Sequence, residues 1–72
     1  MLPSKIQAQV VLRLDIFSKN KYDRILENHP LHGEYAGYRS INITSNLRLI
    51  YQDRGNDVYI LYNVGTHSQL YE

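Results

Sequence analysis

Apolar side chains recur at the spacing of an α-helix in the first part of the chain. Residues 4–17 are good or neutral helix formers, and Pro3 suits a first helical turn. The apolar residues form a stripe and a smaller group on the opposite side of this helix: Ile6, Val10, Leu14 and Phe17 in the stripe, Leu12 and Ile16 in the smaller group. A helix that is apolar on two sides needs cover on both, so we expect one side to pack on a sheet. The other side would contact a second helix, a partner chain or a missing segment.

A short second helix is expected over residues 22–26, where Asn20 is placed to cap the first turn. This helix must end before His29, because a residue that precedes proline disfavours the helical conformation. Gly33 and Gly37 then indicate a loop that leads into the rest of the chain.

Three later segments have features typical of β-strands: two place apolar and polar residues on alternate faces, and the third is rich in tyrosine and valine. They cover residues 39–43, 47–52 and 57–64, and turn-forming residues at 44–46 and 53–56 join them. The alternation assigns the residues of the first two strands to faces: Arg39, Ile41 and Ile43 opposite Tyr38, Ser40 and Asn42, and Leu47, Leu49 and Tyr51 opposite Arg48, Ile50 and Gln52. Strands joined by such short turns form an antiparallel meander.

The whole pattern predicts the α+β class, with an N-terminal helix and a short second helix packed on an antiparallel sheet of three to four strands. Gly65 is expected to end the third strand, and residues 68–71 are the candidate for a closing fourth strand. Seventy-two residues suffice for one small domain, which we place at residues 1–72. A domain of this length buries only about 60% of the surface of its unfolded chain, so we expect marginal stability.

Composition narrows the classes of function. The chain has no cysteine, which excludes disulfides and thiolate metal sites and suits the cytoplasm. The net charge is only +1, so any site for an anion must come from the placement of a few charges. No apolar run approaches the roughly 18 residues that span a bilayer, and we identify no signal peptide. We therefore expect a cytoplasmic protein without a membrane partner.

The residues best suited to chemistry are those that handle phosphate groups. Arg39 and Arg48 each project from a predicted strand, and a guanidinium keeps its charge and binds phosphate oxygens in pairs. His67 follows the third strand, and an imidazole can give or take a proton near neutral pH. His29 can approach from the loop before the first strand, and Tyr71 can stack on a base.

Plainer interpretations stay open for each of these residues. The two arginines can be solvated sheet residues, His67 a turn residue, His29 a residue that shapes its loop, and Tyr71 a packing residue. The spacing of His29 and His32 occurs in zinc sites, but further ligands do not stand nearby, so we predict neither a metal nor a cofactor. The residues alone support a small α+β domain that handles phosphate, and nothing more specific.

Four short motifs follow one another along the chain: His29-Pro30-Leu31-x-Gly33, Gly37-Tyr38-Arg39-Ser40, Arg48-Leu49-Ile50-Tyr51 and Gly65-Thr66-His67-x-x-x-Tyr71. Together they resemble the RelE/ParE toxin superfamily, and most closely the YafQ and RelE/StbE branches of mRNA interferases. The resemblance covers nearly the whole chain. It implies a RelE-like fold of N-terminal helices and a twisted antiparallel sheet.

The resemblance also implies a function, that of a toxin in a type II toxin–antitoxin system. Such toxins cut mRNA without a metal, usually in the ribosomal A site, by attack of a ribose 2′-hydroxyl on the neighbouring phosphorus. The implied partners are a cognate antitoxin, mRNA and the ribosome. The resemblance assigns two sets of residues: His67, Arg48 and His29 to catalysis, and Arg39, Tyr71 and Asn46 to substrate binding.

Two positions depart from the YafQ branch, which has a histidine where Asn42 stands and an aspartate where Asn46 stands. Neither asparagine can give or take a proton at neutral pH. Two alternatives to cleavage therefore stay open. One is an inactive remnant that still binds an antitoxin, which the two asparagines favour. The other is a ParE-like inhibitor of DNA gyrase, against which the Gly-Thr-His-x-x-x-Tyr ending speaks.

The start of the chain departs from the family as well. Family members usually open with a β-strand before the Leu-Pro step, whereas this chain begins with Met1, Leu2 and Pro3. We therefore expect an exposed sheet edge that pairs with another chain. The protein would then be a homo-oligomer or would depend on a partner protein.

Overall fold

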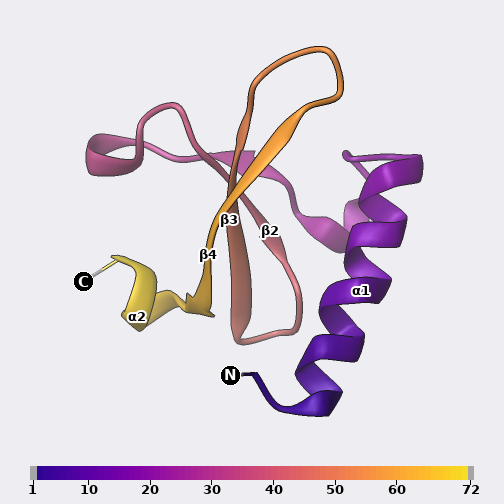
Figure 1. Cartoon of the computed structure of the whole chain (residues 1–72). Helices are drawn as coiled ribbons and strands as arrows, with labels where there is room; N and C mark the ends of the chain where they lie inside the picture. The colour runs from indigo at the N-terminus through magenta and orange to yellow at the C-terminus, as the bar shows by residue number, and fades with distance from the viewer. Residues whose placement is uncertain (1, 72) are drawn as a thin grey trace.

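A computed structural model describes residues 2–71 of the chain, and for His67 and Tyr71 it describes the backbone alone. Figure 1 shows the order of the elements, in which η1 and η2 are single 3₁₀ turns. The elements are α1 (Ser4–Lys19), η1 (Arg24–Leu26), β1 (His29–Pro30), η2 (Gly33–Tyr35), β2 (Arg39–Asn42), β3 (Leu47–Asp53), β4 (Tyr59–Thr66) and α2 (His67–Tyr71). No helix within the described residues is long and apolar enough to cross a membrane.

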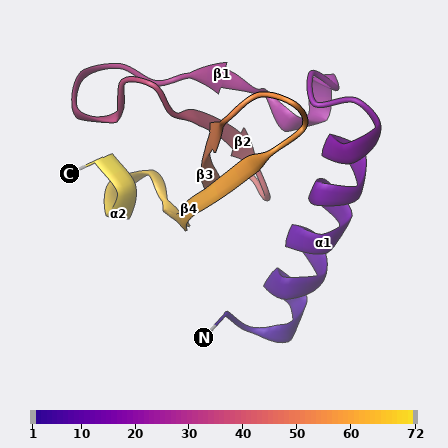
Figure 2. The same ribbon diagram turned by 45° about the horizontal axis from the view of Figure 1, so that its top comes forward.

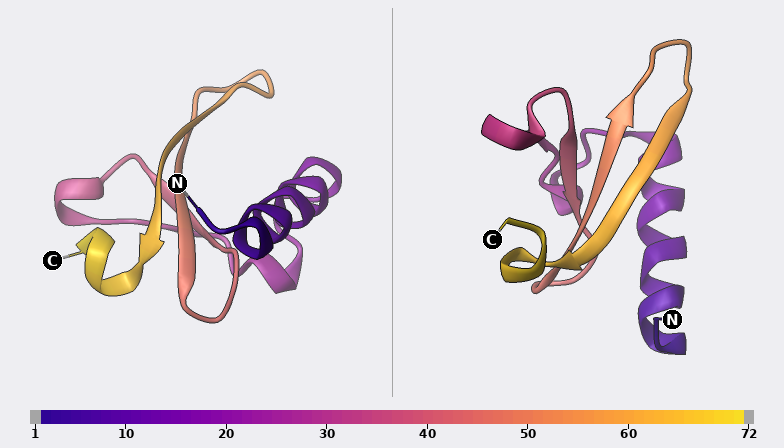
Figure 3. Two further views of the ribbon diagram at one scale, coloured as in Figure 1. Left: turned by 60° about the horizontal axis from the view of Figure 1, so that its bottom comes forward. Right: turned by 60° about the vertical axis from the view of Figure 1, so that its left-hand side comes forward.

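The four strands form one antiparallel sheet in the order β1-β2-β3-β4. Figure 2 shows β1 beside β2, and Figures 1 and 3 show α1 and α2 on opposite sides of the sheet. The β2–β3 hairpin closes at residues 44–46, where the Thr44 hydroxyl accepts hydrogen bonds from the backbone N–H groups of Asn46 and Leu47. This arrangement confirms the α+β class, the helix-first order and the short hairpin turn.

The hydrophobic core lies between α1 and one face of the sheet. The ring of Phe17 packs edge-on against Tyr51 and Tyr59, with centroid distances of 5.1 Å and 4.9 Å. Buried core residues come from the strands and from η1, and partly buried residues of α1 pack on them: Leu26, Ile41, Ile43, Leu49 and Tyr51 in the core, and Val10, Leu14, Ile16 and Phe17 from α1. Aromatic and branched side chains on alternate strand positions thus give the sheet its inner face.

Three details of the N-terminal half differ from the sequence expectation. Ile16 packs against the core, so it does not belong to an opposite side of the helix, whereas Leu12 is 57% exposed. The short second helix is a single 3₁₀ turn over Arg24–Leu26. The side chain that caps it is Asp23, which accepts a hydrogen bond from the N–H of Ile25. Asn20 was the wrong choice, because its side chain accepts from residue 22, before the turn begins.

The C-terminal half corrects two further predictions. Gly65 does not end the last strand, since it pairs with Arg48 inside β4. Residues 68–71 belong to α2 and not to a closing strand. The reason is a capping box, in which the Thr66 hydroxyl accepts from the N–H of Gln69 and the Gln69 side chain accepts from the N–H of Thr66. The fourth strand of the sheet is instead β1, at residues 29–30.

The sheet has two edge strands. β1 and β4 are the outer strands, and β4 carries exposed apolar side chains at Ile60, Leu61 and Tyr62. An exposed edge of this kind can template pairing with another strand. Formation of a homo-oligomer through a sheet edge stays a prediction.

Candidate active site

The register of the sheet places two candidate residues, His29 and Arg48, on one face together with Asn42. Arg48 of β3 pairs with Asn42 of β2 and with Gly65 of β4, while His29 of β1 pairs with Ser40 of β2. Because Ser40 and Asn42 are two residues apart on one strand, their side chains point to the same side. His29, Asn42 and Arg48 therefore share the face of the sheet that lies away from α1.

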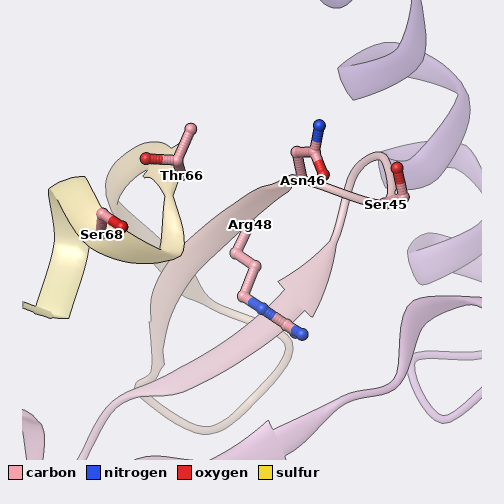
Figure 4. A pocket seen from close by; sticks show the side chains of 5 residues that line it. All are labelled: Ser45, Asn46, Arg48, Thr66 and Ser68. Atoms are coloured by element: carbon pink, nitrogen blue, oxygen red, sulfur yellow. The ribbon is translucent and has the colours of Figure 1, made fainter.

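An open pocket of about 530 Å³ lies at one end of this face. Its lining comes from the β2–β3 turn, from β3 and from the junction of β4 with α2: Ser45, Asn46, Arg48, Thr66 and Ser68. Figure 4 shows these side chains, and the Arg48 side chain extends away from Thr66 and Ser68. The lining thus combines one cation with hydroxyl and amide groups, which suits an anionic, polar ligand.

The guanidinium of Arg48 has unused hydrogen-bonding capacity. Its Nη1 atom is buried and has no hydrogen-bond partner among the described residues, and the same holds for the Oγ of buried Ser40 on the same face. The ion pairs of the described residues join Lys19 to Asp15 and Lys21 to Asp53, so Arg48 is not neutralised by a carboxylate within residues 2–71. Buried donors without partners are rare in folded proteins, and an incoming oxyanion would satisfy this one.

His29 is exposed, and one ring nitrogen is held by the backbone. Its Nδ1 lies 2.8 Å from the carbonyl oxygen of Glu27. A carbonyl can only accept a hydrogen bond, so Nδ1 must carry the hydrogen in this contact, and in the neutral ring the lone pair is then on Nε2. His29 is therefore oriented as a proton acceptor at the rim of the face that carries Arg48.

Arg39 lies on the other face of the sheet, because it pairs with the core residue Tyr51. Its Nε donates to the side chain of Asn28 at 2.8 Å, and its guanidinium lies 5.7 Å from the ring centre of Tyr22. Asn28 also donates to the Tyr51 hydroxyl, whose pKa is raised by burial. The structure does not bring Arg39 together with Arg48, so a substrate contact by Arg39 stays a prediction.

The side chains of His67 and Tyr71 lie outside the described residues. The backbone places His67 as the first residue of α2, directly between two residues that line the pocket, Thr66 and Ser68. Tyr71 is the last residue of the same helix. The catalytic role of His67 and the substrate contact of Tyr71 stay predictions.

A family model for the bacterial toxin YafQ of type II toxin–antitoxin systems matches residues 5–72. The chain belongs to the YafQ toxin family. Membership confirms the resemblance seen in the four motifs, and it implies a cognate antitoxin as a partner. Among curated protein sequences, none matches the chain.

Solved structures of toxins share the fold. YafQ from E. coli BL21(DE3) is 19% identical, with a TM-score of 0.78 over 92% of this chain and 74% of that one. A copper-bound mutant toxin from Helicobacter pylori is 27% identical, with a TM-score of 0.67 over 97% and 76% of the two chains. A YoeB/ParE toxin from Agrobacterium tumefaciens is 18% identical, with a TM-score of 0.69 over 89% and 76%. These likenesses confirm the RelE-like fold.

Sequence reasoning missed part of this YafQ-family site. It identified neither Ser45, Thr66 and Ser68 as lining of the pocket nor Glu27 as the contact of His29. The Thr66-x-x-Gln69 capping box was a readable signal for a helix at this place, and it would have moved Thr66 and Ser68 next to Arg48. No such signal pointed to Glu27, because its contact with His29 depends on the left-handed backbone conformation of Glu27 itself.

Proposed function

We propose that the chain is an endoribonuclease that cuts mRNA, acting as the toxin of a type II toxin–antitoxin system. The observation that supports this most directly is Arg48 at a polar pocket, with a buried Nη1 that has no partner in the described part of the chain, in a member of the YafQ family. His67 begins α2 between two residues that line the same pocket, Thr66 and Ser68. An unpaired fixed charge next to proton-transfer groups is what cleavage of a phosphodiester requires.

The reaction that fits these groups is a transesterification within the RNA. A base removes the proton of a ribose 2′-hydroxyl, and the oxygen attacks the adjacent phosphorus while the bond to the 5′-oxygen of the next nucleotide breaks. The products are a 2′,3′-cyclic phosphate and a 5′-hydroxyl. His29, whose Nε2 is free to accept, serves as the base, and Arg48 binds the non-bridging oxygens as their charge grows.

The leaving 5′-oxygen needs a proton, and His67 is our assignment for the acid.

The spacings of strands and residues put the Cα atoms of His29 and Arg48 roughly 12 Å apart, so the two side chains can reach one phosphodiester from opposite sides. Asn46 at the pocket, together with Arg39 and Tyr71, is assigned to substrate contact. The ribosome would present the mRNA, and the antitoxin would keep the toxin inactive.

The identity of the new RNA ends tests this mechanism. We mix the purified chain with ribosomes that translate a defined mRNA. At each cut, we expect the upstream fragment to end in a 2′,3′-cyclic phosphate and the downstream fragment to begin with a 5′-hydroxyl. A matched mRNA with a single 2′-deoxynucleotide at the cleavage position should stay intact there, because it lacks the nucleophile. Fragments with 5′-phosphates, or cutting at the 2′-deoxy position, would contradict the proposal.

A further inference from the structure

Glu27 makes three hydrogen-bond contacts, and two of them join it to His29 of β1 and Asn42 of β2. It lies between η1 and β1 in the left-handed conformation, with φ 47° and ψ 46°. Its N–H donates to the carbonyl of Arg24 at 3.2 Å, and its own carbonyl accepts from His29 Nδ1 at 2.8 Å. Its carboxylate accepts a hydrogen bond from the side-chain amide of Asn42. A residue other than glycine adopts this conformation at a cost, so its surroundings must hold it there.

The contact with Asn42 joins Glu27 to the strand next to Arg48. Asn42 is the residue of β2 that pairs with Arg48 in β3. The carboxylate of Glu27 makes no ion pair with a lysine or arginine in the described part of the chain, so this amide is its partner. The side chain of Glu27 therefore fixes its backbone relative to the sheet, and the backbone carbonyl fixes the ring of His29.

We propose that Glu27 is a positioning residue of the active site, which holds His29 in the tautomer that has hydrogen on Nδ1 and leaves Nε2 free to accept a proton. This inference rests on the proposed function, since it assigns His29 as the base. Glu27 acts through its hydrogen bond to Asn42 and its carbonyl, and not by taking the proton of the 2′-hydroxyl itself. Asn42, although unable to transfer a proton, then contributes to catalysis by holding Glu27.

Two substitutions at residue 27 separate this role from direct proton transfer. Glu27→Gln keeps an oxygen that accepts from Asn42, whereas Glu27→Ala removes it. We expect kcat to fall about 10- to 100-fold in Glu27→Ala with little change in KM, as for other lost orienting contacts, and to stay within about 2-fold of wild type in Glu27→Gln. Equal losses in both variants would overturn the proposal, because the carboxylate charge itself would then be required.

The tautomer of His29 gives a readout that does not depend on RNA cleavage. In ¹⁵N-detected spectra of the histidine rings, assigned with His29→Gln, we expect the Nδ1–H form to dominate for His29 in the wild type and in Glu27→Gln. It should lose population in Glu27→Ala and in Asn42→Ala, which breaks the same contact from the sheet side. An unchanged tautomer in both alanine variants would overturn the proposal. A protein that shows the tautomer shift but cuts no RNA would refute the proposed function instead.

Discussion

Replacing Arg48 with alanine is expected to lower the single-turnover rate of mRNA cleavage by about 100- to 1000-fold. Arg48 is the cation of the pocket, and one of its donors is buried without a hydrogen-bond partner among residues 2–71 as described. Under the proposed mechanism, its removal would take away the group that stabilises negative charge on the phosphate during attack. Arg48→Lys keeps the charge but not the planar pair of donors, so we expect an intermediate rate.

The control for this prediction is Arg54→Ala. Arg54 is exposed in the β3–β4 turn, where it donates to Gln52, and β3 separates it from Arg48 by roughly 20 Å at 3.4 Å per residue. The same loss of charge there should leave the cleavage rate close to that of wild type. Equal rates for wild type and Arg48→Ala, in protein with an unchanged circular dichroism spectrum, would remove Arg48 from the mechanism.

Replacing Leu49 with alanine is expected to cost about 2–5 kcal/mol of the free energy of unfolding. Leu49 is 1% exposed and belongs to the core that α1 covers. The loss combines the transfer energy of the removed carbons with the cavity that they leave. Because small domains are stable by only about 5–15 kcal/mol, we expect a large drop in the denaturant midpoint, measured by urea unfolding.

A leucine on the outer side of α1 is the matched control for Leu49. Leu12 is 57% exposed, so Leu12→Ala should change the free energy of unfolding by no more than about 0.5 kcal/mol. If Leu12→Ala were as destabilised as Leu49→Ala, this would contradict a core formed within one chain. That result would mean that another chain covers the outer side of α1, and the stability of the wild type should then depend on protein concentration.

The sheet could be predicted further than the site could. Alternation in residues 39–43 and 47–52, with a turn centred at residue 45, leads to the pairing of Asn42 with Arg48 and hence to two distinct faces. It also separates Arg39 from Arg48, because these residues stand on opposite faces once the register is set. The register of β4 against β3 could not be predicted, since the pairing is irregular between Ile50 and Tyr51 of β3.

The parts of the site that escaped prediction depend on single contacts between distant residues. The two-residue strand β1 is too short for a periodic signal, and it forms because His29 and Pro30 pair with Ser40 and Arg39. Glu27 reaches Asn42 across 15 positions of the sequence, and no local pattern encodes this contact. Arg48 and His67, in contrast, stand in the short motifs that carried the resemblance to this toxin superfamily.

Mapping mRNA 5′ ends after induced expression tests the central claim most directly. We expect wild-type protein to arrest growth and to create new 5′ ends within coding sequences. Arg48→Ala and His67→Ala, expressed to the same level, should do neither. Arrest without new ends would contradict cleavage and favour inhibition of gyrase, whereas folded wild-type protein that causes no arrest would identify an inactive remnant.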